Sequence, residues 1–463
     1  MTSPDPVSRP RPRFKKRQEP AAASADPESL FGDLPRTPHG VGALWSHQAD
    51  QLRTYSKKHQ KSPDVALELP TGSGKTLVGL LIAEWRRRAL RERVVYACPT
   101  KQLARQVLEK AKQQGIQPVL LIGSHWNWPR SDVARYTSGA AIAITTYSSI
   151  FNSNSHLGDA QTLLFDDAHA AEGYVAEAWS VSVKRDDPQY TALLDAFRPV
   201  VDSSFLNRMA ADTAADSAEV RLLPIGAIAS NLESIDDVLR TISDNRKYAF
   251  GMLQPNLASC LFYVARSGVY IRPLIPPTFA HDAFTGPTQR VYLSASLGDA
   301  GELERAFGRV PIDRVPVPPA WDRTGSGRRF FVFPELAEAP TDPKGMVVSP
   351  APAATEPANS EQSAISDDSV TLEGVTAALL NLAKKRLILT PDDKSADEIA
   401  NRLQVPQAER FTAKTDSGLA PFLKAESGTL LAPNRYDGMD LSAETCRLML
   451  MAGLPIASLS AVM

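Results

Sequence analysis

Cysteine is scarce in this chain of 463 residues, which contains only Cys98, Cys260 and Cys446. These three are too scattered for a C-x-x-C metal pair and too few for a disulfide scaffold or a four-cysteine iron–sulfur cluster. Also missing is any apolar run near the roughly 20 residues that a membrane span requires, and no apolar segment follows the basic residues at the N-terminus. We therefore expect a cytoplasmic protein of a reducing compartment, without a membrane partner.

The chain also has almost no net charge. The 51 Lys and Arg residues nearly cancel the 52 Asp and Glu residues, which leaves a formal net charge of -1. This balance excludes polybasic carriers such as histones, and any affinity for nucleic acid must come from local surface. With 43% hydrophobic residues the chain has an ordinary globular composition, and its length leaves room for about three packed units.

Two segments lack periodic apolar residues. Residues 1–37 combine a basic run with prolines, which predicts a disordered basic tail. That run could contact phosphates, but we prefer a solvated tail of no special function. Residues 337–370 are rich in Pro, Ala, Ser, Glu and Asp, which predicts a linker.

Between these breaks, short apolar runs alternate with stretches of helical periodicity. The predicted strands are 65–69, 94–98, 119–122, 141–146, 163–167 and 291–296. Such alternation predicts an α/β fold with a mostly parallel sheet. We expect a first lobe at 38–170 plus 284–336, interrupted by a helical insertion at 171–283. A second α/β unit is expected at 371–463, beginning with a helix at 372–383, a strand at 386–390 and a helix at 395–403.

A glycine-rich loop carries the sharpest chemical signal. It follows the strand at 65–69, opens a helix at 76–87 and reads Leu69-Pro70-Thr71-Gly72-Ser73-Gly74-Lys75-Thr76. This context is that of a P-loop, whose backbone N–H groups and helix N-terminus bind the phosphates of ATP. Lys75 would contact the β and γ phosphates, and Thr76 would ligate Mg²⁺. Leu69 departs from the strict pattern, which has glycine there.

A P-loop needs a second metal-binding carboxylate at the end of another strand. The segment 162–169 ends in Asp166-Asp167-Ala168-His169 and supplies one. Asp166 would hold Mg²⁺, and Asp167 would orient or deprotonate the attacking water. An Asp-Asp pair at a strand end is often only a turn, but the preceding P-loop favours a catalytic site.

Together these motifs resemble those of the DEAD/DEAH-box helicases of superfamily 2, which have RecA-like lobes. In that family Asp166–His169 corresponds to motif II, with Asp167 in place of the usual Glu. Because Asp is one methylene shorter, a base at this position must lie about 1.5 Å closer to its target or act through a second water.

The resemblance implies further roles, motif by motif. Gln48 would read adenine, although an exposed glutamine at a helix start is the alternative. Thr100, Lys101 and Arg105 of motif Ia and Thr146 of motif Ib would contact nucleic-acid phosphates. His169 of motif II would work with Ser294 and Ser296 of motif III to couple the nucleotide site to the nucleic-acid site.

The 124 residues between His169 and Ser294 resemble the insertion of the XPD/DinG-type helicases, here without the iron–sulfur cluster. Residues 436–441 resemble motif V, in which Asp440 would reach the nucleotide. Motif VI, with the arginine fingers of the family, is not found: 23 residues follow Asp440, and Arg447 is the sole arginine among them.

Truncation, a break in the reading frame or a finger supplied by a protein partner would each account for this, and we favour truncation. We then expect an incomplete second lobe, slow ATP hydrolysis and an apolar segment at 448–456 that has no pairing partner.

The sequence therefore predicts an ATP- and Mg²⁺-dependent helicase or translocase on single-stranded nucleic acid, with DNA favoured over RNA by analogy. The alternative is an ATP-gated nucleic-acid-binding protein without efficient hydrolysis.

Overall fold

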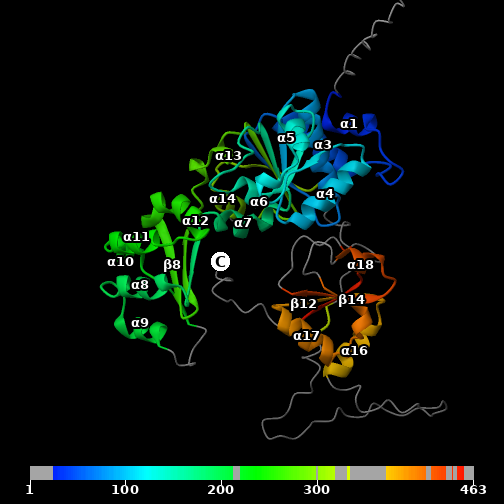
Figure 1. Cartoon of the computed structure of the whole chain (residues 1–463). Helices are drawn as coiled ribbons and strands as arrows, with labels where there is room; N and C mark the ends of the chain where they lie inside the picture. Colours follow the sequence, from blue (N-terminus) through cyan, green and yellow to red (C-terminus); the bar gives the residue numbers. More distant parts are fainter. Residues whose placement is uncertain are drawn as a thin grey trace, which may run out of the picture.

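The computed structural model describes residues 24–211, 219–298, 301–318, 331–333, 372–412, 419–433, 441 and 446–452. The start of the predicted tail, the predicted linker at 337–370 and Asp440 lie outside these residues. The described chain forms one large parallel sheet, a second smaller one and an antiparallel sheet between them in sequence (Figure 1).

The first lobe is built on a seven-stranded sheet in the order β11-β1-β10-β5-β2-β4-β3. All its pairings are parallel, which confirms the predicted fold class. The strands are β1 (Asp64–Glu68), β2 (Val94–Cys98), β3 (Val119–Leu120), β4 (Ala143–Thr146), β5 (Thr162–Phe165), β10 (Gln289–Ser294) and β11 (Asp313–Val315). Six were predicted, and the short edge strand β11 was missed.

Helices cover both faces of this sheet, which is why its strands are nearly continuous apolar runs. One face packs against α1 (Pro27–Asp33), α2 (Ser46–Thr54), the π-helical turn η1 (Tyr55–His59), α3 (Lys75–Ala89) and α4 (Lys101–Gln113). The other packs against α5 (Arg130–Thr137), α6 (Tyr147–Ile150), α7 (Ala171–Glu177), α13 (Asp282–Thr285) and α14 (Glu302–Phe307). Short 3-10 turns lie at η2 (His125–Asn127), η3 (Ala168–Ala170) and η5 (Thr278–Ala280).

Helix α1 corrects the predicted disordered tail. Its N-cap Asp26 accepts a 2.7 Å hydrogen bond from the backbone N–H of Ser29, which satisfies one of the free donors of the first turn. Leu30, Phe31 and Leu34 are buried in the same core cluster as α3. The prediction was wrong from residue 27 onward, because local composition does not reveal that a distant helix offers these side chains an apolar face.

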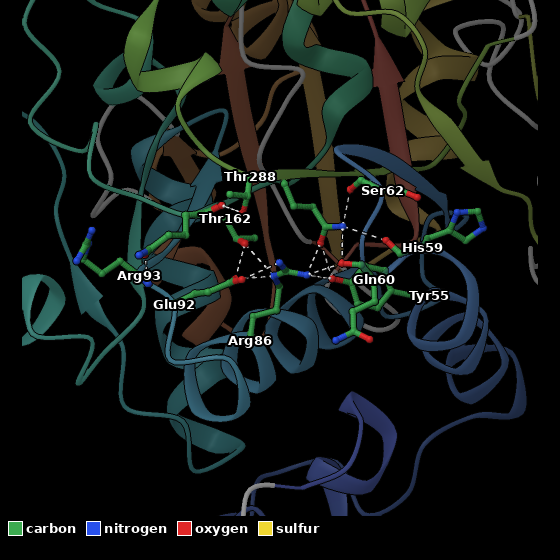
Figure 2. A network of polar contacts seen from close by, with 11 residues as sticks. Tyr55, His59, Gln60, Ser62, Arg86, Glu92, Arg93, Thr162 and Thr288 are labelled. Atoms are coloured by element: carbon green, nitrogen blue, oxygen red, sulfur yellow. Dashed lines mark hydrogen bonds and ion pairs between the residues drawn. The ribbon is translucent and has the colours of Figure 1, made fainter.

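A buried arginine ties helix α3 to the sheet at the end remote from the P-loop (Figure 2). The Arg86 guanidinium donates to Glu92, to Thr162 of β5, to Gln289 of β10 and to Tyr55 of η1, at 2.7–2.9 Å. Tyr55 in turn donates to Gln289 at 2.6 Å. One side chain therefore fixes four elements of the lobe against one another.

The insertion contains the predicted helices and also a sheet that the prediction missed. Its helices are α8 (Pro188–Phe197), α9 (Ser203–Ala210), α10 (Ile225–Ala229), α11 (Leu232–Arg240) and α12 (Arg246–Leu253), followed by η4 (Gln254–Ser259). Its four antiparallel strands run in the order β6 (Val181–Lys184), β9 (Gly268–Pro273), β8 (Cys260–Ala265) and β7 (Val220–Leu222). Strands β8 and β9 form a tight hairpin, in which Ala265 pairs with Gly268.

The second unit is also α/β, as predicted. Its parallel sheet has the order β13 (Arg410–Thr412), β14 (Gly428–Pro433), β12 (Lys385–Thr390) and β15 (Leu448–Met451). Its helices are α16 (Leu372–Asn381), α17 (Asp393–Arg402) and α18 (Leu419–Lys424), with a turn at η8 (Gln407–Glu409). The apolar segment that we expected to be unpaired is paired with β12 over its first residues, and Leu450 packs into a core cluster there.

Candidate ATP-binding site and nucleic-acid interface

The loops that carry the predicted motifs gather at one edge of the first sheet. Strands β1, β10, β5, β2 and β4 are neighbours and run parallel, so their carboxyl ends share this edge. The P-loop follows β1, motif II follows β5 and motif III follows β10, while motifs Ia and Ib follow β2 and β4. Ligands of open α/β sheets bind outside the carboxyl ends of the strands.

The P-loop has the backbone conformation that its glycines predict. Gly72 and Gly74 have φ angles of +85° and +81°, in the left-handed region that favours glycine. A Cβ atom on Gly74 would lie 2.2 Å from Gln48 Nε2, so any other residue would displace the Gln48 amide and also have to adopt the positive φ. Helix α3 begins at Lys75, directly after this turn, and its free N–H groups face the loop.

Gln48 and His47 hold the P-loop from the side of helix α2. Gln48 Nε2 donates to the backbone oxygen of Ser73 at 2.9 Å, and Gln48 Oε1 accepts from Trp45 N at 3.0 Å. His47 Nε2 lies 2.9 Å from the same Ser73 oxygen. Gln48 is buried, which excludes the alternative of an exposed glutamine at a helix start. Its contact with adenine stays a prediction.

The three predicted catalytic residues come together between the P-loop and motif II. Lys75 Nζ forms an ion pair with Asp167 Oδ1. Asp166 is buried beside it and accepts hydrogen bonds from Tyr96 Oη and from the backbone N–H of Asp167, both at 3.0 Å. Burial and the neighbouring Asp167 carboxylate raise the pKa of Asp166 above its ordinary value.

The backbone of motif II is strained at its second aspartate. Asp167 has φ +50° and ψ +50°, a left-handed conformation in which Asp and Asn are found more often than other non-glycine residues. Tyr147 Oη donates to the backbone oxygen of the preceding Asp166 at 2.7 Å and fixes this turn from the start of α6.

The donor set fits ATP and Mg²⁺. No group of three or more His, Cys, Asp or Glu residues within the described chain is placed to hold a metal ion. Mg²⁺ usually needs only one or two carboxylates, together with substrate phosphates and water. Asp166 offers such a carboxylate, and Thr76 lies next to Lys75 at the start of α3. The buried Ser73 hydroxyl has no hydrogen-bond partner among the described residues, so it is free to bond a phosphate oxygen.

The predicted coupling residues of motifs II and III also meet. Ser294 Oγ lies 3.3 Å from His169 Nδ1 and donates to the backbone oxygen of Ser296. The backbone oxygen of Ser294 accepts from Leu69 N, at the start of the P-loop, at 2.8 Å. His169 and Ser296 line one cavity of about 320 Å³. Motif III is therefore linked to both nucleotide motifs.

The predicted nucleic-acid contacts occupy the neighbouring strand ends. Thr100 caps helix α4 by accepting from Leu103 N at 3.1 Å, and Lys101 and Arg105 are exposed on the first turns of that helix. Thr146, at the end of β4, pairs in register with the last residue of β2. Its side chain is buried and bonded to the hydroxyls of Ser148 and Ser149, so a phosphate contact there would use the backbone.

Three supporting side chains were not predicted: His47, Tyr96 and Tyr147. Tyr96 and Tyr147 both lie within or next to strand runs that read as plain core, and only the fold brings their hydroxyls to Asp166. His47 stands next to Gln48, and that adjacency was the one available signal.

Comparison with known proteins agrees with this arrangement. Residues 48–194 match the model of the DEAD/DEAH box helicase family. Similar solved structures include Xpd4 of S. tokodaii, with 14% identity over 90% of this chain and 84% of that chain and a TM-score of 0.48. The helicase Lhr of Mycobacterium smegmatis, bound to ssDNA and AMP-PNP, has 16% identity over 92% of this chain and 44% of that chain, with a TM-score of 0.43. No curated protein sequence matches the chain.

A membrane-crossing helix, which would have to be long and apolar, does not occur in the described parts of the chain. The matched segment contains the P-loop and motif II, whose side chains meet at the carboxyl edge of a RecA-like parallel sheet. Residues 48–194 are therefore similar to a DEAD/DEAH box helicase domain.

Proposed function

We propose that this protein is an ATP-dependent translocase that moves along single-stranded nucleic acid and thereby separates strands. The observation that carries the proposal is the meeting of Lys75 with Asp167, beside the buried Asp166. A P-loop lysine and a motif II carboxylate pair are the groups that phosphoryl transfer from ATP requires.

Each site residue has a role in this proposal. The loop from Thr71 to Thr76 would bind the phosphates, and Gln48 would lie toward the adenine. Asp166 and Thr76 would hold Mg²⁺, which when bound offsets the negative charge of the phosphates. Asp167 would leave its ion pair with Lys75 to orient the attacking water. Asp440 would contribute from the second unit.

The strand would cross the neighbouring strand ends, from Thr100, Lys101 and Arg105 to the backbone at Thr146. We call this row of contacts, from Thr100 to Thr146, the proposed track. The coupling residues His169, Ser294 and Ser296 would transmit the state of the nucleotide to it. The chain's resemblance to XPD/DinG-type helicases favours DNA over RNA. The free thiols of the three cysteines agree with a cytoplasmic location.

The proposed organisation keeps the predicted units, with the tail shortened. The first lobe and the second unit would be the two motor lobes, and the insertion from β6 to β9 would be an accessory unit on the first, since α7 and α13 at the ends of the predicted insertion pack on the first lobe. Both proposed motor lobes have parallel sheets, whereas the insertion has an antiparallel one.

The test is ATP-driven displacement of a labelled strand from a duplex with a single-stranded tail. We expect displacement by the wild-type protein and none by Lys75→Ala, which lacks the phosphate-binding ammonium group. Absence of displacement with tails of either polarity, in DNA and in RNA, would contradict the translocase.

One observation favours a second function, an ATP-gated clamp that binds single strands without efficient hydrolysis. Asp167 is shorter than the family's glutamate and is held by Lys75, so its carboxylate would have to leave this ion pair to reach a water that attacks the γ-phosphate. A clamp would bind single strands more tightly with ATP than with ADP but would displace no strand. Lys75→Ala would abolish that difference between the nucleotides.

A further inference from the structure

A cluster of four rings lies just beyond the predicted nucleic-acid contacts and has no role in the site described above. It consists of His125, Trp126 and Trp128 from the turn after β3, together with His156 from the loop between α6 and β5. The His125 and His156 ring centroids are 3.6 Å apart with an angle of 30° between planes, and His125 and Trp126 are 4.5 Å apart at 38°. Trp128 meets both imidazoles edge-on, at 6.5 Å.

The cluster is built on a firmly held turn. Trp128 packs against the large core cluster, and its Nε1 donates to the backbone oxygen of Ile122 at 3.2 Å. The backbone N–H groups of Asn127 and Trp128 close the turn on Ser124 and His125 at 3.0 and 3.1 Å. Trp126 nevertheless remains 85% exposed. An apolar ring of this size is therefore presented to solvent on a rigid support, at low cost in conformational entropy on binding.

The position of the turn continues the proposed track. Strand β3 pairs with β4, which pairs with β2, so the carboxyl ends of the three strands lie in a row. Thr100 follows the first of these strands in that row, Thr146 ends the second, and the ring cluster follows the third. A nucleic-acid single strand that runs from motif Ia past Thr146 would therefore reach this turn next.

We propose that Trp126, supported by His125 and His156, is a stacking platform for an unpaired base of the bound strand. The inference rests on the proposed function. The exposed flat ring of Trp126 matches the π-face of a base, which is open in a single strand and covered in a duplex. Partial burial, and then His156, lower the pKa of His125, which disfavours a positive charge on its ring within the stack. Stacking of this kind accepts any base.

The experiment compares Trp126→Leu, Trp126→Phe and the wild type in equilibrium binding of fluorescent single-stranded oligonucleotides. Leucine keeps an apolar surface but removes the ring, and phenylalanine restores a ring. We expect Trp126→Leu to bind about 5- to 100-fold more weakly and Trp126→Phe to recover most of the loss. The slope of affinity against salt should not change, because no phosphate contact is removed.

An oligonucleotide of abasic sites provides the matched probe, since it has the same phosphates and no bases. The wild type and Trp126→Leu should bind it equally. If the wild type binds and displaces strands while Trp126→Leu matches its affinity for the normal oligonucleotide, the platform is wrong and the proposed function stands. Equal losses on normal and abasic strands would also overturn the platform, because they indicate a backbone contact or a structural defect. If the wild type binds no single strand, both proposals fail.

Discussion

At the scale of single residues, the buried carboxyl group of Asp166 lowers the stability of the fold at neutral pH and provides a candidate ligand for Mg²⁺. Its carboxyl group is buried, and burial together with the Asp167 carboxylate raises its pKa. A carboxyl with a raised folded-state pKa binds more protons in the folded than in the unfolded state. Its contribution to stability is therefore favourable at low pH and is lost as pH rises from the ordinary aspartate range through the raised pKa.

This pH dependence can be tested by removing the Asp166 charge. Asp166→Asn removes the buried charge, and the amide oxygen can accept from Asp167 N while the amide NH₂ donates to Tyr96 Oη. In the absence of nucleotide and Mg²⁺, the variant should be more stable at pH 7 by roughly 1–3 kcal/mol, with a smaller advantage near pH 4. Urea unfolding at both pH values measures this. A variant that is less stable than the wild type at pH 7 would contradict the burial argument.

The residues of the candidate ATP-binding site differ in how far the sequence alone could predict them. Lys75, Asp166 and Asp167 were predicted because each lies within a short contiguous motif whose chemistry is local. The Tyr96 and Tyr147 hydroxyls that hold Asp166, and the ring of His156 against His125, were not, because their partners are far away in the chain. Such contacts exist only after the strands are ordered in the sheet.

At the scale of elements, Arg86 fixes helix α3, which carries the P-loop at its first residue. The Arg86 side chain is 4% exposed and its partner Glu92 is 16% exposed, so the pair is screened little by solvent. Burial raises the pKa of Tyr55 to about 12, which keeps its phenol protonated as a donor to Gln289. Removal of the guanidinium would leave the Glu92 carboxylate without its ion-pair partner and Gln289 with one donor fewer.

Accordingly, Arg86→Met should lower the free energy of unfolding by about 3–5 kcal/mol. The matched control is Arg88→Met, two residues along the same helix, where the side chain is 36% exposed and paired with Glu84. That change should cost no more than about 1 kcal/mol, because Glu84 keeps its pair with Arg87. Urea unfolding midpoints compare them. Similar losses in the two variants would mean that the buried network is not a special restraint.

Elements were predicted best where periodicity and flanking turns agree. The strands around the P-loop and motif II are continuous apolar runs and were found within a few residues of their observed bounds. Helix α1, strand β11 and the sheet of the insertion were missed, since each is short and is stabilised by packing partners elsewhere. Strand β7, for example, has three residues and forms only against β8.

At the scale of the whole molecule, a net charge of -1 means that affinity for nucleic acid depends on a few placed cations. Lys101→Ala should weaken binding to single strands of every sequence and reduce the slope of log affinity against log salt by about 0.7, the value for one phosphate contact. Binding titrations between low and moderate salt test this. An unchanged slope would remove Lys101 from the proposed track.

In the proposed function, ATP hydrolysis at the P-loop and motif II is coupled to a bound single strand. Steady-state ATP turnover with and without single-stranded oligonucleotide, measured for the wild type beside Lys75→Ala, tests it most directly. We expect the single strand to raise the turnover of the wild type and Lys75→Ala to show no turnover under either condition. A wild-type rate equal to that of Lys75→Ala with DNA, with RNA and with neither would contradict it.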